Sequence, residues 1–266
     1  MHQPDPEASA ELPCPDPTDD HQLATAMAAS AGAALAEMKE QALAAGVGAW
    51  TLRDRGDQLG HDLLTGWLAE HRPDDVVLSE EGSEDRRRLD GGRTWIVDPL
   101  DGTHDFPFRD SMEWAVHVAL VTDDLPTAAA VAVPGMNETF STATIDRPWA
   151  DRPGRAEPLV ICGRSNLYFA AEVADEVGGR VTACGSSGVK AMLVVAGAAD
   201  VYVHASGLYE WDVCAPAAVA AAKGLVVSDI HGDQIVYNKR RPIVEGFVVA
   251  RPELAAITRA TLDRLL

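Results

Sequence analysis

The stretch Trp95-Ile96-Val97-Asp98-Pro99-Leu100-Asp101-Gly102-Thr103 is an apolar β-type run that ends in two carboxylates and a turn. Pro99 fixes one backbone angle and Gly102 lets the backbone approach a neighbouring group, so both aspartates can point at one site. A helix that begins near Thr103 would aim its free N–H groups at that site and favour a bound anion such as phosphate. Alternatively, Asp98 and Asp101 only accept hydrogen bonds from amides of their own turn.

Two more acids follow an earlier predicted strand. Val76–Leu78 is a short apolar run, and Glu80 and Glu81 come soon after it. Carboxylate oxygens at strand ends, together with the backbone carbonyl of Leu100, suit Mg²⁺, whereas zinc normally takes His or Cys ligands. The pattern therefore predicts a site for a hard cation. The alternative for Glu80 and Glu81 is an exposed acidic loop.

A third acidic position lies at the start of a predicted helix. Asp212 precedes Val213-Cys214-Ala215-Pro216, and proline is tolerated in the first turn of a helix. An aspartate here is commonly an N-cap, which accepts hydrogen bonds from free N–H groups. Taken with Glu80, Asp98 and Asp101, it is also a candidate ligand for the same cation.

A glycine- and serine-rich segment, Gly185-Ser186-Ser187-Gly188-Val189-Lys190, opens another predicted helix. Its amides and the Lys190 ammonium could hold a sugar or a phosphate group. It is not a Walker loop, because the GxxxxGK[ST] spacing is absent. The alternative is a plain loop followed by a surface lysine.

The composition excludes several classes of protein. The chain has 266 residues, 47% apolar and 24% charged, as expected of one large folded domain or two packed ones. Its 41 acidic and 22 basic residues give a formal net charge of −19, which opposes binding to a nucleic-acid polymer. No apolar run approaches the roughly 18 to 20 residues of a membrane span, and no secretory signal is present, so we expect a cytoplasmic protein.

Hydrophobic periodicity and composition divide the chain into three predicted parts. Residues 1–20 form a flexible tail rich in proline and acids. Residues 21–150 form an α+β half, in which one helix covers Leu23 to Ala42 and a second begins near Asp62. Residues 158–266 form an α/β half, in which short strands alternate with helices.

Three blocks of the sequence resemble the metal-site motifs of the inositol monophosphatase and fructose-1,6-bisphosphatase superfamily. They are LSEEG at 78–82, WIVDPLDGT at 95–103 and WDVCAPA at 211–217, in the superfamily's order and spacing. Within this superfamily the chain is most similar to 3′(2′),5′-bisphosphate nucleotidases of the CysQ type, particularly actinobacterial ones. That similarity is carried by AWTLRDRGD at 49–57, GSSGVKAM at 185–192 and YNK at 237–239.

The resemblance implies a layered α-β-α-β-α sandwich that holds two or three Mg²⁺ ions between its halves. The implied metal ligands are Glu80, Asp98, the carbonyl of Leu100, Asp101 and Asp212. The implied substrate contacts are Gly102, Thr103, Ser186, Ser187, Lys190 and Glu210. Glu80 and Thr103 are also the implied catalytic groups that orient the attacking water.

One position departs from the superfamily's pattern. Relatives commonly carry a Thr-x-x-Asp or Thr-x-Asp stretch that supports a third metal and the attacking water, whereas residues 56–62 read GDQLGHD, without the threonine. Asp62 or Asp57 would fill this role, and Asp62 is the candidate catalytic residue.

The resemblance predicts a Mg²⁺-dependent phosphomonoesterase that hydrolyses the 3′-phosphate of adenosine 3′,5′-bisphosphate to AMP and phosphate by a metal-activated water. The enzymatic alternatives are an inositol-1-phosphate or a fructose-1,6-bisphosphate phosphatase. A noncatalytic anion-binding protein is the alternative from another class. The expected partner is a small phosphate ester, neither a nucleic-acid polymer nor a membrane. The family also implies a possible homodimer, inhibition by lithium and a place in sulfur metabolism.

Overall fold

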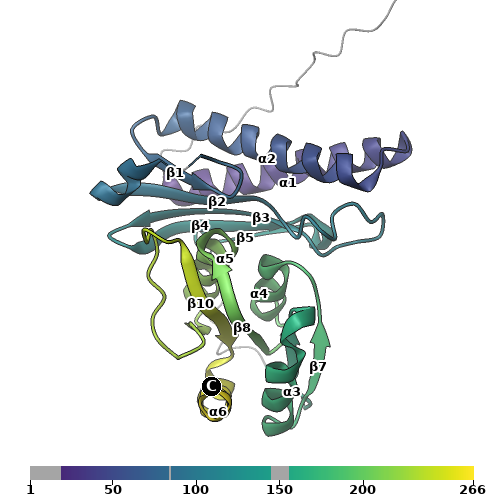
Figure 1. The fold of residues 1–266 in the computed structure, drawn as a ribbon, viewed down its shortest axis with the longest axis vertical. Helices are drawn as coiled ribbons and strands as arrows, with labels where there is room; N and C mark the ends of the chain where they lie inside the picture. Colours follow the sequence, from purple (N-terminus) through teal and green to yellow (C-terminus); the bar gives the residue numbers. More distant parts are fainter. Residues whose placement is uncertain (1–18, 84, 145–155) are drawn as a thin grey trace, which may run out of the picture.

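The computed structural model describes residues 19–83, 85–144 and 156–266. Within them, layers of helices alternate with two five-stranded sheets (Figure 1). The outer layer on the first sheet consists of α1 (Asp20–Ala44) and α2 (Ala49–His71). The α-β-α-β-α sandwich expected from the resemblance is confirmed.

The first sheet has the strand order β1-β2-β3-β4-β5. β1 and β2 are parallel, and the other neighbours are antiparallel. β3 is buried along nearly its whole length because helices cover both faces of the sheet, as its continuous apolar sequence predicts. The strands are β1 (Val76–Ser79), β2 (Arg93–Asp101), β3 (Ala115–Thr122), β4 (Leu125–Val133) and β5 (Glu138–Ser141).

The second sheet has the order β7-β6-β8-β10-β9 and mixes parallel and antiparallel pairs. Its strands are β6 (Leu159–Cys162), β7 (Arg180–Ala183), β8 (Val201–Tyr209), β9 (Val226–Ser228) and β10 (Ile243–Ala250). The middle layer between the two sheets contains α4 (Ser187–Val195) and α5 (Glu210–Ala222). The outer layer contains α3 (Leu167–Glu176) and α6 (Pro252–Leu265).

Successive side chains of β2 point to opposite faces of the sheet and so into different layers. Trp95 and Val97 pack toward α1 and α2, whereas Ile96 packs into the central core with α4 and α5. That central core also includes Tyr202 and Phe247 of the second sheet. The central layer therefore receives side chains from the end of β2 and from the first turns of α4 and α5.

Helix α2 begins thirteen residues before the predicted position near Asp62, at Ala49. Gly56 and Gly60, which are unfavourable inside helices, explain why the pattern of this segment is weak. A β-carbon at Gly56 would lie 2.7 Å from Leu100 Cδ2, and one at Gly60 would lie 2.8 Å from the carbonyl oxygen of Pro99. The two glycines thus let α2 pass directly against the end of β2.

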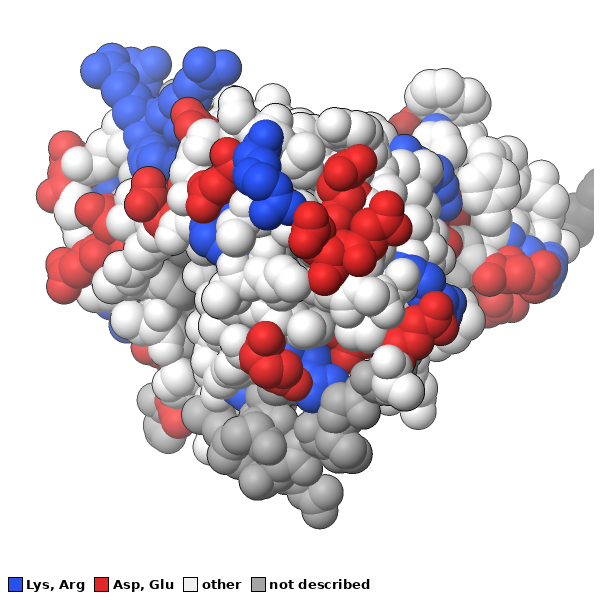
Figure 2. Space-filling view, turned by 90° about the horizontal axis from the view of Figure 1, so that it is seen from below, with Lys and Arg blue, Asp and Glu red and all other residues white. Residues whose placement is uncertain are grey.

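The predicted tail, residues 1–20, lies outside the described residues except for Asp19, which caps α1, and Asp20, which begins it. The predicted boundary between residues 150 and 158 also lies largely outside them, so the division into halves stays a prediction. No helix in the described ranges is long and apolar enough to cross a membrane. Seen from below, acidic and basic groups are interspersed on the described surface, with one larger basic group at the upper left (Figure 2).

Candidate active site

A bulge at the end of β2 brings Asp98 and Asp101 to the same face of the sheet. Asp98 pairs with His117 of β3 and Asp101 pairs with Ala115, so three steps on β2 match two on β3. In a regular strand, residues three apart point to opposite faces, and the extra residue of the bulge removes that difference. Both carboxylates therefore point into the central layer.

Asp98 uses its two carboxylate oxygens differently. Oδ1 accepts the N–H of Leu100 at 3.1 Å, which is the local turn bond that the alternative interpretation predicted. Oδ2 is buried and has no hydrogen-bond partner. Burial and the negative charge of Asp101 raise the pKa of Asp98 well above its ordinary value. The free oxygen is thus available to a ligand that compensates for its burial.

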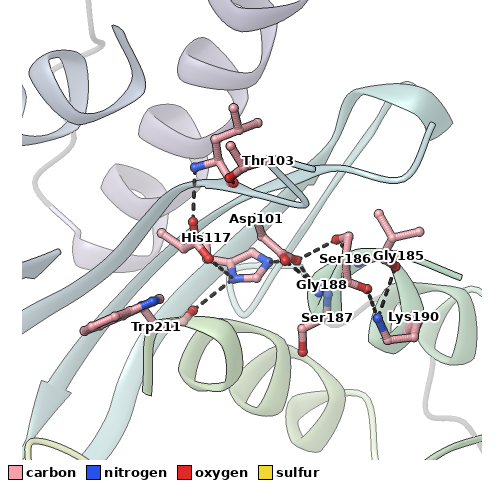
Figure 3. Close-up of polar contacts among 12 residues, drawn as sticks. Asp101, Thr103, His117, Gly185, Ser186, Ser187, Gly188, Lys190 and Trp211 are labelled. Atoms are coloured by element: carbon pink, nitrogen blue, oxygen red, sulfur yellow. Dashed lines mark hydrogen bonds and ion pairs between the residues drawn. The ribbon is translucent and has the colours of Figure 1, made fainter. Parts of the chain in front are cut away.

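Asp101 is bonded to the N-terminus of α4 (Figure 3). Its Oδ2 accepts the Ser186 hydroxyl at 2.5 Å and the Gly188 N–H at 2.7 Å, and its Oδ1 accepts the Ser187 N–H at 3.1 Å. Burial alone would raise the pKa of Asp101, but the positive charge of His117 and these hydrogen bonds hold it well below its usual range. Asp101 is the carboxylate of the site that stays ionised.

Asp212 stands in the first turn of α5 and has two roles at once. Its Oδ2 accepts the N–H of Tyr209 at 2.9 Å, so it completes a capping box as the third residue of α5; the N-cap is Tyr209, and the alternative prediction of Asp212 as the N-cap is wrong. One oxygen each of Asp98, Asp101 and Asp212 lie within 4.8 Å of one another. We call these three carboxylates the acidic group. Burial and the charge of Asp101 raise the pKa of Asp212 to about 7.

Glu80 and Asp57 extend this acidic group toward solvent. Partial loss of hydration and the charges of Asp212 and Glu81 raise the pKa of Glu80 to about 7. Partial burial and the charge of Glu81 raise the pKa of Asp57 to about 6. In both groups burial is the larger cause, and the negative charges of neighbouring carboxylates add to it.

Thr103 connects α2 to the turn after β2. Its hydroxyl lies 2.8 Å from the carbonyl oxygen of Leu100 and 3.3 Å from Oδ1 of Asp57, and can donate to either. Residues 102–107 form turns, so no helix begins at Thr103 and the condition for a helix N-terminus that binds an anion at this point is not met. Gly102 has φ +88°, and a β-carbon there would lie 2.3 Å from the carbonyl oxygen of Glu113. The close approach that Gly102 permits is therefore to the backbone of Glu113.

The predicted substrate contacts on α4 face inward. Ser186, Ser187 and Lys190 are 7%, 6% and 5% exposed. Lys190 donates to the carbonyl oxygens of Gly185 at 3.1 Å and Ser186 at 2.5 Å, while Ser186 adopts φ +52° and caps α4 (Figure 3). The anion that this helix N-terminus holds is Asp101, so these residues position a carboxylate of the acidic group, and their contact with a substrate stays a prediction.

Two other predicted site residues, Glu210 and Asp62, do not belong to the acidic group. Glu210 is fully buried and accepts the N–H groups of Asn238 at 2.7 Å and Lys239 at 3.0 Å. Asp62 is exposed on α2 and accepts a hydrogen bond from Gln58 at 2.7 Å. Five residues along a helix amount to about 500°, so Asp62 points roughly 140° away from Asp57. Between these two candidates, the one that joins the acidic group is Asp57.

His117 is a site residue that the sequence alone did not single out. Its side chain is fully buried, with Nε2 3.2 Å from Oδ2 of Asp101, Nδ1 3.0 Å from the carbonyl oxygen of Trp211 and 4.0 Å from Oδ2 of Asp98. Burial lowers its pKa, but the charge of Asp101, the contacts with Asp101 and the Trp211 carbonyl, and the charge of Asp212 together raise it above its ordinary value. One histidine inside the apolar run 115–121 was the available signal, because a buried charged group needs a partner.

The acidic group fits a hard cation. It combines three buried or half-buried carboxylates within 4.8 Å of one another, an unpartnered oxygen on Asp98 and mutual repulsion that raises several pKa values. A divalent cation would remove this repulsion and give the free oxygen a partner. The donor set contains oxygen atoms only and does not resemble a zinc site.

A layered sandwich with such a carboxylate group at the end of β2 defines a metal-dependent phosphatase of the inositol monophosphatase type. The chain belongs to the inositol monophosphatase family, whose model matches residues 19–159 and 160–263. The predicted superfamily and enzyme class are therefore confirmed.

Relatives within this family are similar over most of the chain. The 3′-phosphoadenosine 5′-phosphate phosphatase of Mycobacterium leprae is 38% identical over 253 residues, covering 90% of this chain and 91% of the relative. The 3′(2′),5′-bisphosphate nucleotidase CysQ of Escherichia coli is 33% identical over 73% of this chain and 83% of its own.

Solved structures share the fold. A staphylococcal IMPase-II has a TM-score of 0.74 at 20% identity and covers 92% of this chain and 94% of its own. CysQ from Bacteroides thetaiotaomicron has a TM-score of 0.65 at 25% identity, with 85% and 94% covered. The first likeness shows the fold alone, and the second agrees with the predicted similarity to CysQ-type nucleotidases.

Proposed function

We propose that this chain hydrolyses the 3′-phosphate of adenosine 3′,5′-bisphosphate to give AMP and phosphate, with Mg²⁺ as cofactor. The observation that carries the proposal is the group of Asp98, Asp101 and Asp212, whose oxygens lie within 4.8 Å of one another. The substrate follows from relatives named as phosphatases of this bisphosphate, at 38% identity over 90% of the chain.

The proposed metal ligands are Asp98, Asp101 and Asp212, with Glu80 beside them and the carbonyl of Leu100 at the end of β2. Mg²⁺ would supply charge neutralisation and Lewis acidity for the transfer of a phosphoryl group to water. Asp101 is kept ionised by His117 and by the N-terminus of α4, so it can bind a cation without first losing a proton.

Asp57, Thr103 and Glu80 are the proposed groups around the attacking water. Thr103 has one hydroxyl proton, which it can donate either to Asp57 or to Leu100. When the proton lies toward Asp57, a lone pair of the hydroxyl oxygen can accept a hydrogen bond from water. Asp57 and Glu80 have pKa values of about 6 and about 7, close to the range in which a carboxylate exchanges protons at neutral pH.

Parallel assays of phosphate release test the proposal. We expect kcat/KM for adenosine 3′,5′-bisphosphate to exceed that for inositol 1-phosphate and fructose 1,6-bisphosphate by at least about tenfold, or about 1.4 kcal/mol. A preference for either of the other two substrates would contradict the assignment. Binding of the bisphosphate without release of phosphate would instead indicate the noncatalytic alternative.

Asp98→Asn tests the proposed metal site itself. The amide keeps the shape of the side chain but removes a ligand charge, so we expect turnover to fall by about 10³-fold or more. Near-normal turnover would contradict the proposed metal site. The homodimer implied by the family and the cytoplasmic location expected from the sequence stay predictions, and chromatography with light scattering would test the first.

A further inference from the structure

Three charged side chains meet beside the N-terminus of α4, outside the acidic group. Arg164 belongs to the short 3-10 helix η4 (Arg164–Asn166), which follows β6, and donates to Oδ2 of Asp105 at 3.1 Å and to Oδ1 at 3.3 Å. Its Nη2 also donates to Oε2 of Glu113 at 2.7 Å. Asp105 and Glu113 both lie in the connection between β2 and β3, so one guanidinium joins this connection to the second sheet. We call these three residues the ionic clamp.

Glu113 extends the ionic clamp to the start of α4. The Oε2 atom that accepts from Arg164 also accepts the N–H of Gly185, at 2.6 Å. A β-carbon at Gly185 would lie 2.2 Å from Oδ2 of Asp105 and 2.9 Å from Oε2 of Glu113, so both carboxylates close directly over this glycine. Hydrogen bonds from an N–H to an ionised carboxylate are roughly twice as strong as neutral ones. The ionic clamp therefore sets the position of Gly185.

Lys190 holds the same segment from inside the fold. Its ammonium donates to the carbonyl oxygens of Cys184 at 3.3 Å and Gly185 at 3.1 Å. Between these contacts Ser186 adopts φ +52°, in the left-handed region that a residue with a β-carbon occupies only when its surroundings impose it. Bonds to Glu113 on one side and to Lys190 on the other impose this conformation.

The conformation of this turn determines how Asp101 is held. The Ser186 hydroxyl and the N–H groups of Ser187 and Gly188 donate to its carboxylate at 2.5, 3.1 and 2.7 Å (Figure 3). These three donors directly follow Gly185 in the chain, so a shift of Gly185 would move all of them. The orientation of Asp101 thus depends on residues that do not touch it.

The exposure of the ionic clamp indicates that it positions groups more than it stabilises the fold. The side chain of Arg164 is 59% exposed and that of Glu113 is 33% exposed. Exposed ion pairs contribute little to folding stability, because water and salt screen them. Metal affinity is more sensitive, and losing a group that orients a metal ligand typically costs about 10- to 100-fold in affinity.

We propose that Arg164, Glu113 and Asp105 are positioning residues, which fix the start of α4 so that Asp101 presents its carboxylate to the cation in one orientation. This inference rests on the proposed role of Asp101 as a metal ligand. It assigns a task to three residues that lie outside the metal-site motifs and makes the cation site depend on a contact between the two sheets.

Calorimetric titration of the full chain with Mg²⁺ tests the inference without turnover. Glu113→Ala should raise the Kd for Mg²⁺ by about tenfold or more. Glu113→Gln should restore most of the affinity, because both bonds end on one oxygen and the amide keeps an oxygen. As a control, Arg264→Ala removes an exposed arginine that pairs with Glu176 at 2.6 Å and should leave the Kd within twofold. Unchanged affinity in Glu113→Ala would overturn the inference.

A double-mutant cycle tests whether Arg164 acts through Glu113. Arg164→Ala should raise the Kd for Mg²⁺ by about threefold or more, and the variant with both alanines should bind Mg²⁺ no more than about twofold more weakly than Glu113→Ala alone. Losses that simply add would overturn this coupling. A rise in KM for the bisphosphate with an unchanged Kd for Mg²⁺ would show that Arg164 contacts the substrate directly, which also overturns it.

Amide hydrogen exchange in the metal-free protein reports on the positioning itself. The N–H groups of Ser187 and Gly188 should exchange at least tenfold faster in Glu113→Ala and Arg164→Ala, whereas that of Val118 in the middle of the first sheet should not change. Equal acceleration at Val118, or none at the two α4 amides, would overturn the inference. Exchange does not require hydrolysis, so if no phosphate were released the proposed function would fail and these amides would still decide the role of the ionic clamp.

Discussion

The Nε2 atom of His117 lies 3.2 Å from Oδ2 of Asp101, and the imidazole is fully buried between β3, the end of β2 and the start of α5. A β-carbon at Gly188 would lie 2.1 Å from the same nitrogen, so only glycine lets α4 close over this pair. The histidine therefore connects β3, on which it lies, with β2 and α5, the two elements that carry Asp98, Asp101 and Asp212.

Replacing His117 should weaken metal binding. We expect His117→Ala to shift the Mg²⁺ dependence of activity to about 10- to 100-fold higher concentration, because Asp101 loses a partner that orients it. Titrating activity with Mg²⁺ measures the shift, and the gain in Tm on adding Mg²⁺ measures it without turnover. His117→Gln, which can still donate to Asp101, should recover part of the affinity. An unchanged Mg²⁺ dependence in both variants would contradict this role.

Asp57 and Asp62 form a matched pair on α2. Asp57→Asn should lower kcat by about 100-fold or more, because it removes the carboxylate next to Thr103. Asp62→Asn removes an equal charge from the exposed face of the same helix and should leave kcat within twofold. Phosphate release under saturating substrate and Mg²⁺ measures both. A larger effect at Asp62 would restore the assignment based on sequence alone.

Glu210 should matter more for folding than for direct contact with the substrate. Its buried carboxylate accepts two backbone N–H groups, so Glu210→Ala should reduce the free energy of unfolding by about 2 to 4 kcal/mol in urea titrations. Glu210→Gln should also be destabilising, because its NH₂ group cannot accept from an N–H. A rise in KM with unchanged stability would instead support the contact with the substrate that the resemblance implies.

The metal-free protein should lose stability as the pH rises from about 4 to about 7. The pKa values of Asp57, Glu80 and Asp212 are about 6, about 7 and about 7 in the folded chain, above the ordinary 3.8 for aspartate and 4.5 for glutamate. In this window the unfolded chain releases these protons first, which favours unfolding. Asp101, whose pKa is lowered, contributes in the opposite direction and at lower pH.

Mg²⁺ should reverse this loss. We expect its addition to raise Tm by about 2 to 8 °C more at pH 7.5 than at pH 5, which corresponds to about 1 to 2 kcal/mol for a chain of this size. Thermal melts in chelator and in Mg²⁺ at the two pH values measure the difference. An equal effect of Mg²⁺ at both pH values would show that these carboxylates do not bind it.

Much of the fold could be predicted from local pattern. The continuous apolar run of β3 and the periodic face of α1 correspond closely to the observed elements. The predicted start of helix α2 is too late because Gly56 and Gly60 weaken the helix propensity of this segment. These two glycines allow close packing against residues about forty positions away. A local pattern contains no information about such a contact.

The sequence by itself identified the candidate groups for the chemistry and most of the elements that hold them. It identified the acids at the ends of β1 and β2 and at the start of α5, and the helix N-terminus at Ser186. Only the tertiary structure decided what those groups face. The amides of α4 bind Asp101, Glu210 binds the backbone before Arg240, and Asp57 faces Thr103 while Asp62 faces water. The physical reason is that hydrogen bonding and charge pairing depend on distance in space, and chain packing sets that distance.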